Sequence, residues 1–291
     1  MTLVPASDDL VVEVGPIAHG GHCVARLDGR VVFVRHTLPG ERVRIRVTDT
    51  GHEKFWRADA VEILDASPDR VEPRCAASGP GRCGGCDFQH VSLAAQRRLK
   101  AKVLAEQLDR LAGITWDGEV EPVVRPGTED GLHWRTRMRY QVDSSGQAGL
   151  RRHRSHEVER LPPGGCPLAA PSTPAVTDRQ WEPGAELLTI AELSDPMVVG
   201  ATTGSDNSAE VIEHAAGRSW RVAADGFWQV HPGAADTLAR AVSDGLAPRV
   251  GERAFDLYCG VGLFAGVLVD AGVRTWGVEW SRSAIEHARR N

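Results

Sequence analysis

The sequence predicts a fold of class α/β plus β, built from three consecutive parts. Short alternating strands at the N-terminus predict an OB-like five-stranded barrel. A four-cysteine loop then opens a central α+β domain, and a glycine-rich strand–turn–helix near the C-terminus predicts the start of a Rossmann-like sheet. The chain has 291 residues, which favours two or three domains over one. We place the domain boundaries at residues 1–66, 67–222 and 223–291.

Five segments of the first domain carry apolar residues at alternate or nearly alternate positions, which is typical of strands with one buried face. These segments are Leu10–Val14, Cys23–Leu27, Val31–Val34, Glu41–Thr48 and Arg57–Ile63. Asp28-Gly29 separates the second from the third and is a strong signal for a two-residue hairpin turn. Small barrels bind nucleic acid in some proteins and are purely structural in others, so the barrel alone assigns no function.

Four cysteines have the spacing of a metal site. Cys75 is followed by Cys83-Gly84-Gly85-Cys86 and, much further along the chain, by Cys166. Thiolates in short loops with small residues can surround a tetrahedral metal ion or an iron–sulfur cluster, and the two glycines let the backbone turn tightly around it. Two disulfides are the alternative, which we rank below metal for a chain without an export signal.

The segment after the cysteine loop predicts one long helix. Ser92 is a suitable N-cap, Gly113 a suitable end, and apolar residues are expected along one side. These residues are Leu93, Val103, Leu104, Leu108 and Leu111. We expect this helix, residues 92–112, to pack on the C-terminal domain.

Arginines gather on two segments of the central domain. Arg135, Arg137 and Arg139 alternate along the strand expected at Trp134–Val142, and a second basic strand is expected around Leu150–Arg154. Such a face is either a solvated surface or a set of phosphate contacts, and the sequence leaves both interpretations open.

The C-terminal domain opens with a nucleotide-binding pattern. An apolar strand, Arg253–Tyr258, runs into Gly260-Val261-Gly262, a helix follows, and a second strand ends at Glu279. The glycines permit close approach of the backbone to a ligand, and an acidic residue about twenty positions further on binds ribose hydroxyls. The turn also satisfies the dinucleotide pattern, so NAD is the alternative ligand. Asp256 favours S-adenosylmethionine, because a carboxylate there suits a cationic ligand and repels a pyrophosphate.

Composition narrows the class of protein. The net charge of −5 argues against a uniformly basic nucleic-acid-binding coat, and the apolar and charged fractions are those of an ordinary globular protein. Residues 1–10 show no export signal and no apolar run is long enough to span a membrane, so we expect a cytoplasmic protein.

Taken together, the motifs resemble those of the RNA (uracil-5-)-methyltransferases, whose members join a TRAM barrel, a [4Fe-4S] loop and a Rossmann-like methyltransferase domain. The matching stretches cover nearly the whole chain. They are residues 20–48 for the barrel, Cys83–His90 (CGGCDFQH), Gly165–Leu168 (GCPL), Phe227–Val230 (FWQV) and Asp256–Phe264 (DLYCGVGLF).

The resemblance implies a set of site residues. It implies that Cys75, Cys83, Cys86 and Cys166 ligate a [4Fe-4S] cluster, with structural zinc as the alternative. It also implies that Gln229, Tyr258 and Glu279 contact S-adenosylmethionine, beside the turn glycines Gly260 and Gly262. Leu263 departs from the family, which often has an asparagine there that helps to bind the cofactor. A radical enzyme is disfavoured, because four cysteines leave no iron of the cluster open.

The implied reaction is methylation of carbon 5 of uridine in RNA, with ribosomal RNA favoured and transfer RNA the alternative. In the family a cysteine thiolate adds to the neighbouring ring carbon, and a general base later removes the carbon 5 proton. Both groups lie well downstream of the glycine turn in the family, so no catalytic residue is assigned before Asn291. We therefore expect a monomeric fragment that is inactive alone, or alternatively a non-catalytic iron–sulfur RNA-binding protein that contacts no membrane.

Overall fold

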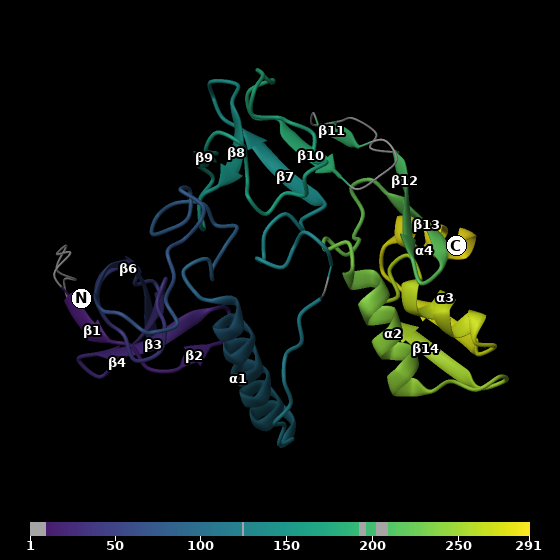
Figure 1. The fold of residues 1–291 in the computed structure, drawn as a ribbon, viewed down its shortest axis with the longest axis horizontal. Coiled ribbons are helices and arrows are strands. Elements are labelled where there is room, and N and C mark those ends of the chain that lie inside the picture. Colours follow the sequence, from purple (N-terminus) through teal and green to yellow (C-terminus); the bar gives the residue numbers. More distant parts are fainter. Residues whose placement is uncertain (1–9, 124, 192–195, 202–208) are drawn as a thin grey trace. The chain divides into compact units, whose positions relative to one another are not determined.

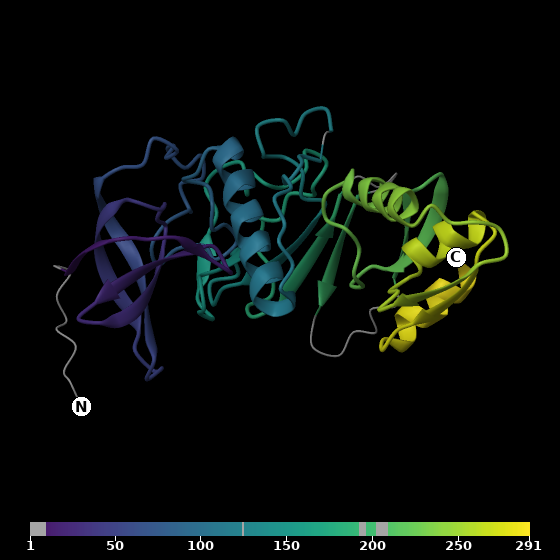
Figure 2. The same cartoon turned by 90° about the horizontal axis from the view of Figure 1, so that it is seen from below.

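The structure is a computed structural model that describes residues 10–123, 125–191, 196–201 and 209–291. It divides into two compact units (Figures 1 and 2). Unit 1 comprises Met1–Pro122 with Leu150–Gly164, and unit 2 comprises Val123–Gly149 with Gly165–Asn291. The expected boundaries at residues 66 and 222 stay a prediction. Residues 1–9, where no export signal is expected, lie outside the described part of the chain.

Unit 1 contains a curled sheet whose six strands have the order β1-β5-β6-β4-β3-β2 (Figure 1). They are β1 (Leu10–Glu13), β2 (Ile17–Ala18), β3 (His22–Leu27), β4 (Arg30–Arg35), β5 (Arg42–Asp49) and β6 (Phe55–Asp65). The five expected strands are present, and β2 adds a sixth of two residues. The sheet closes because the Gly15 N–H donates to the Val24 carbonyl at 2.7 Å and the Val24 N–H donates to the Pro16 carbonyl at 3.0 Å.

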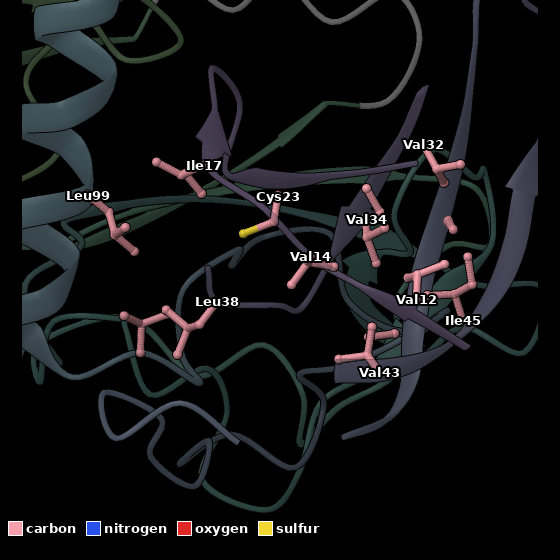
Figure 3. Close-up of a cluster of buried hydrophobic side chains, with 14 of the residues drawn as sticks. Val12, Val14, Ile17, Cys23, Val32, Val34, Leu38, Val43, Ile45 and Leu99 are labelled. Carbon is pink, nitrogen blue, oxygen red and sulfur yellow. The ribbon is translucent and has the colours of Figure 1, made fainter. Parts of the chain in front are cut away.

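The barrel is filled by small branched side chains from alternate strand positions. Val12 and Val14, Val32 and Val34, and Val43 and Ile45 point inward together with the Cys23 thiol (Figure 3). Cys23 is fully buried and its thiol lies 3.5 Å from the Thr37 carbonyl. The apolar residues that alternate along these segments in the sequence are therefore the residues whose side chains are buried in the barrel.

Helix α1 (Leu93–Ala112) begins after Ser92 and ends at Gly113, which has the left-handed conformation, as expected. The Ser92 side chain makes no capping hydrogen bond. The expected apolar side is wrong at Leu104 and Leu111, which are exposed, and right at Val103. Ala95, Leu99 and Val103, spaced four residues apart, pack against the barrel core. Packing of this helix on residues 223–291 stays a prediction.

Unit 2 begins with an antiparallel sheet in which β7 (Arg137–Val142) pairs with β10 (Glu186–Ile190), and β10 pairs with β11 (Met197–Ala201). β8 (Ala148–Arg151) pairs with β7 through Ala148 and Gly149, and the chain then passes into unit 1, where β9 (Val158–Arg160) follows. A hairpin of β12 (Glu210–Ala215) and β13 (Arg218–Ala223) precedes helix α2 (Ala234–Leu246), for which the sequence analysis made no prediction.

The C-terminal part of unit 2 is the expected β–α–β arrangement. β14 (Arg253–Leu257) and β15 (Arg274–Val278) pair in parallel and are joined by α3 (Leu263–Asp270), and α4 (Arg282–Arg290) follows. Trp220 of β13 is fully buried, and its ring lies so close to Gly266 of α3 that a Cβ there would come within 2.5 Å of it. None of the described helices is both long enough and apolar enough to cross a membrane.

Candidate functional site

The turn between β14 and α3 is organised by Glu279, which follows β15 at the same edge of the parallel pair. One oxygen of its carboxylate accepts the Gly260 N–H at 2.9 Å, and the other accepts the N–H groups of Trp280 and Ser281 at 2.7 and 2.9 Å. These backbone hydrogen bonds, from Ser281 and then Gly260, lower the pKa of Glu279 below its ordinary value. Glu279 is therefore an ionised acceptor held across the glycine turn.

The backbone of the turn adopts conformations that favour glycine. Gly260 and Gly262 have φ angles of 56° and 91°, and a Cβ on Gly262 would lie 3.4 Å from the Ala288 side chain. Tyr258 also has a positive φ, 66°, and its N–H donates to the Val278 carbonyl at 2.7 Å. A non-glycine residue held in this region stores strain, and such strain is concentrated at functional sites. The Tyr258 side chain is 90% exposed, so its ring is available to a ligand.

Gln229 lies in a loop that is anchored on both sides. Trp228 is buried in the same apolar cluster as Val261 of the glycine turn, and the Val230 carbonyl accepts two hydrogen bonds from Thr136 at 2.9 and 3.0 Å. The loop of Gln229 and the glycine turn thus share one core, which holds both in fixed positions. Leu263, where the family often has asparagine, is buried in that core and acts as a packing residue.

Asp256 has a role that the sequence did not predict. Its side chain is buried, and one oxygen accepts the Ala265 N–H in the first turn of α3 at 2.9 Å. Burial raises the pKa of Asp256, and this hydrogen bond partly opposes the rise. The carboxylate that favoured a cationic ligand over a pyrophosphate therefore also stabilises the helix N-terminus.

Three of the four expected metal ligands lie in one loop of unit 1. Cys75 and Cys83 are buried and Cys86 is partly exposed. The Gly85 N–H donates to the Cys83 sulfur and the Gln89 amide donates to the Cys86 sulfur, each at 3.4 Å. N–H donors aimed at sulfur fit thiolate ligands, which carry negative charge. Cys166 is partly exposed and belongs to unit 2.

Gln89 belongs to the CGGCDFQH motif of this loop, and the motif alone assigns it no role. Its side-chain oxygen accepts the Cys75 N–H at 3.0 Å while its amide nitrogen reaches the Cys86 sulfur. Gln89 therefore fixes two of the cysteines relative to each other. In the sequence, the signal for this role is that Gln89 lies three residues after Cys86, within reach of its sulfur.

The CxxC segment is also held against the end of β8 and the residues that follow it. Gly84 donates to the Arg151 carbonyl at 3.1 Å, and a Cβ on Gly84 would lie 2.9 Å from the His153 backbone. None of the six cysteines, all in the described part of the chain, forms a disulfide. Among the described residues, no group of three or more Cys, His, Asp or Glu side chains is already arranged to hold a metal ion.

The arginines of β7 do not form one exposed row. Arg137 is 6% exposed and pairs with Glu213 at 2.7 Å while donating to the Ala224 carbonyl at 2.8 Å. Arg139 is exposed and pairs with Glu186. Arg137 and Arg139 project from the same face of β7, but Glu213 and the Ala224 carbonyl cover Arg137, so the three arginines do not form the expected shared surface.

A parallel β–α–β unit with a glycine turn and an acidic residue after the second strand is typical of the start of a Rossmann-like sheet. Residues 10–61 match the TRAM domain model. An RNA methyltransferase of Streptomyces avermitilis is 50% identical over 98% of this chain and 75% of its own length. The 23S rRNA (uracil(1939)-C(5))-methyltransferase RlmD of Thiobacillus denitrificans is 30% identical over 97% of this chain and 75% of its own length. This chain belongs to the RNA methyltransferase family that includes these proteins.

A solved structure has the same fold. The tRNA (uracil-54, C5)-methyltransferase of Pyrococcus abyssi, in complex with S-adenosyl-L-homocysteine, matches with a TM-score of 0.64 and 20% sequence identity. The match covers 97% of this chain and 75% of that chain. The expectation that this chain is inactive alone gains no support from these comparisons, because the relatives align over nearly all of it.

Proposed function

We propose that this chain binds S-adenosylmethionine and acts in the methylation of carbon 5 of uridine in RNA, with 23S ribosomal RNA as the favoured substrate. The observation that carries the proposal is the Glu279 carboxylate held across the Gly260 turn at the end of β15. Two relatives that are 30% identical to this chain are named as methyltransferases of uracil carbon 5 in 23S rRNA, and they support the reaction type.

The residues have distinct roles in this proposal. Gly260 and Gly262 let the backbone approach the cofactor closely, and Glu279 accepts hydrogen bonds from the ribose hydroxyls. The exposed Tyr258 ring and the side chain of Gln229, in its anchored loop, contact the remainder of the cofactor. S-adenosylmethionine, when bound, supplies an electrophilic methyl group on a sulfonium centre.

Neither cysteine outside the proposed metal ligands suits the role of nucleophile. Burial raises the pKa of Cys23 to about 11, and Cys23 lies inside the barrel. Burial also raises the pKa of Cys259, with the negative charges of Asp256 and Glu279 adding to the rise. Both thiols are therefore protonated near neutral pH, whereas addition to a uracil ring needs a thiolate. We assign no catalytic cysteine to this chain.

The cysteine loop is proposed to hold a [4Fe-4S] cluster through Cys75, Cys83, Cys86 and Cys166. The N–H groups aimed at the Cys83 and Cys86 sulfurs support thiolate ligands. The cluster would stabilise the loop and supply no step of the methylation. Structural zinc remains the competing occupant, because four thiolates suit it equally.

The proposal is tested by separating cofactor binding from methyl transfer. Calorimetric titration of the chain with S-adenosylhomocysteine should give saturable binding, and Glu279→Gln should weaken it about tenfold because an ionic hydrogen-bond acceptor is lost. Incubation with labelled S-adenosylmethionine and either 23S rRNA or tRNA transcripts then reports methyl transfer, with nuclease digestion to identify 5-methyluridine.

A matched control is Glu286→Gln, which removes an exposed carboxylate from α4 and should leave the affinity unchanged. Equal affinities of wild type and Glu279→Gln would refute the cofactor site. Cofactor and RNA binding without 5-methyluridine is the outcome expected if the nucleophile lies outside this chain. RNA binding without saturable cofactor binding would favour the second candidate function, a non-catalytic iron–sulfur RNA-binding protein. That candidate is supported by the lack of a suitable nucleophile in Cys23 and Cys259, since Cys23 is fully buried inside the barrel and burial raises the pKa of both thiols.

A further inference from the structure

The outward face of three neighbouring barrel strands carries aromatic and basic side chains. β6, β4 and β3 are adjacent in the sheet, and the register places Phe33 beside Val24 on one side and Arg57 on the other. Val32, Val34 and Ala58, which alternate with these residues, fill the barrel. Phe33 and Arg57 therefore project from the opposite face of the sheet, outside the barrel core.

Four rings on this side of the barrel form a continuous row, which we call the aromatic row: His22, Phe33, Phe55 and His52. Edge-to-face contacts join His22 to Phe33 at 6.3 Å and Phe33 to Phe55 at 5.3 Å between ring centroids. His52 stacks on Phe55 at 4.3 Å with an interplanar angle of 19°. His52 is exposed and Phe55 is half-buried, so the row ends in solvent.

Positive charge borders the aromatic row. The Arg57 guanidinium lies 5.1 Å from the centroid of the Phe55 ring. Arg57 and Arg154 both approach the Asp49 carboxylate, at 3.7 and 3.9 Å, which is beyond hydrogen-bonding distance. One carboxylate thus faces two guanidinium groups, and exposed Lys54 lies in the same loop as His52. Exposed Glu53 lies in that loop too, so Arg57, Arg154 and Lys54 are set against Asp49 and Glu53, and the local charge is +1 on a chain whose net charge is −5.

The aromatic rings on this outer face are not the side chains that exposure to solvent alone would favour. The water-facing side of an antiparallel sheet normally carries polar residues, and apolar rings there indicate a contact surface. Aromatic rings next to guanidinium groups suit single-stranded nucleic acid, since bases stack on the rings and phosphates pair with the arginines. OB-type barrels use a sheet face for such binding.

We propose that the aromatic row with Arg57 and Arg154 is a stacking platform for a single-stranded segment of the RNA substrate. The proposal rests on the proposed function for the nature of its ligand and adds the surface of unit 1 that binds it. A base stacks on the outer face of His52 and Phe55, and the adjoining phosphates pair with Arg57 and Arg154.

The test measures RNA binding by the full chain. Fluorescence anisotropy with a labelled uridine-rich single strand of about 12 nucleotides, within the range that an OB fold covers, gives the Kd. Phe55→Ala should raise the Kd about 5- to 100-fold, the effect of losing one stacked base. Arg57→Gln should weaken binding and lower the slope of log Kd against log salt by about 0.7, the contribution of one phosphate contact in a single strand.

Two variants guard against loss of folding as the cause. His52→Ala removes an exposed ring that the barrel core does not use, and it should weaken binding in the same direction as Phe55→Ala. Phe55→Tyr keeps a stacking ring and should bind like wild type. Phe255→Ala, which removes a 69% exposed phenylalanine from unit 2, is the control for general loss of an aromatic side chain.

Cross-linking locates the RNA directly. RNA that carries 4-thiouridine should, after irradiation, leave adducts on the peptide containing residues 52–57. If Phe55→Ala and His52→Ala both bind RNA with the Kd of wild type, the platform is overturned and the proposed function is left intact. Absence of any RNA binding by the wild type, with S-adenosylhomocysteine binding preserved, would overturn both. Binding of a protein in place of RNA at these rings would also overturn the platform.

Discussion

At the scale of single residues, identical side chains a few positions apart have different roles. Arg137 and Arg139 both belong to β7, yet Arg137 is buried against Glu213 and Arg139 is exposed beside Glu186. Burial raises the pKa of Glu213, and the hydrogen bond from Arg137 opposes that rise. The Arg137 guanidinium also satisfies the Ala224 carbonyl. Arg137 is therefore a structural residue of unit 2.

We predict that Arg137→Met destabilises unit 2 by about 3–5 kcal/mol, because it leaves the Glu213 carboxylate buried without its partner. Arg139→Gln should cost about 0–1 kcal/mol, as expected for an exposed pair. Urea unfolding followed by tryptophan fluorescence measures both midpoints. The double variant Arg137→Met with Glu213→Leu should recover most of the loss, since a well-packed apolar pair replaces a broken ionic one. Equal midpoints for Arg137→Met and Arg139→Gln would contradict this role.

At the scale of elements, the turn between β4 and β5 is joined to the start of the cysteine loop by one buried carboxylate. Glu41 accepts two hydrogen bonds from Arg70, at 2.6 and 2.7 Å, and the N–H groups of Leu38 and Ser67 at 2.8 and 3.1 Å. Burial raises the pKa of Glu41, but the hydrogen bonds from Arg70, Ser67 and Leu38 outweigh it and hold the pKa below its ordinary value of 4.5. The barrel and the segment after β6 therefore stabilise each other.

Because the pKa of Glu41 is lower in the folded state, the free energy of unfolding of unit 1 decreases at acid pH. The contribution of ionised Glu41 is fully present above pH 4.5 and is lost as the pH falls through the lower folded pKa. We predict that Glu41→Gln destabilises unit 1 by about 2–4 kcal/mol at neutral pH and flattens its stability profile below pH 4.5. Thermal unfolding at several pH values checks this. Glu62→Gln, at an exposed pair with Arg44, is the control; an unaltered acid profile in Glu41→Gln would refute the prediction.

At the scale of the whole molecule, the proposed roles are divided between the two units. Three of the four proposed cluster ligands, Cys75, Cys83 and Cys86, belong to unit 1, whereas Cys166 and every residue proposed to contact S-adenosylmethionine belong to unit 2. Changes at Cys83 should therefore affect the loop and RNA binding before they affect the cofactor.

We predict that Cys83→Ser lowers the iron content and the visible absorbance of anaerobically purified protein, destabilises unit 1 and weakens RNA binding. The affinity for S-adenosylhomocysteine should remain within about twofold of wild type. Cys23→Ala removes a cysteine that is not a proposed ligand and should retain the iron. Metal analysis that finds zinc instead of iron would exclude the iron–sulfur cluster, and normal folding and RNA binding of the cluster-free variant would refute its structural role.

The accuracy of the sequence-based predictions depended on whether the deciding interactions were local. The barrel strands, the β–α–β unit and both ends of α1 were predicted correctly, because alternation, glycine turns and helix ends are local signals. The buried face of α1 was predicted only in part, since Val103 packs against the barrel core but Leu104 and Leu111 do not. Leu104 and Leu111 fit an amphipathic pattern as well as Leu99 does, and only the barrel determines which side is covered.

The sequence by itself determined the five main barrel strands, the ends of α1, the spacing of the cysteines and the glycine turn with Glu279, since each depends on residues close together in the chain or on side-chain chemistry. Tertiary structure alone decided that Arg137 is buried, that Asp256 accepts a helix N–H, that Gln89 joins two cysteines and that four rings line one barrel face. Most of these contacts join different elements, and burial is a property of the packed chain, so no local pattern reveals them.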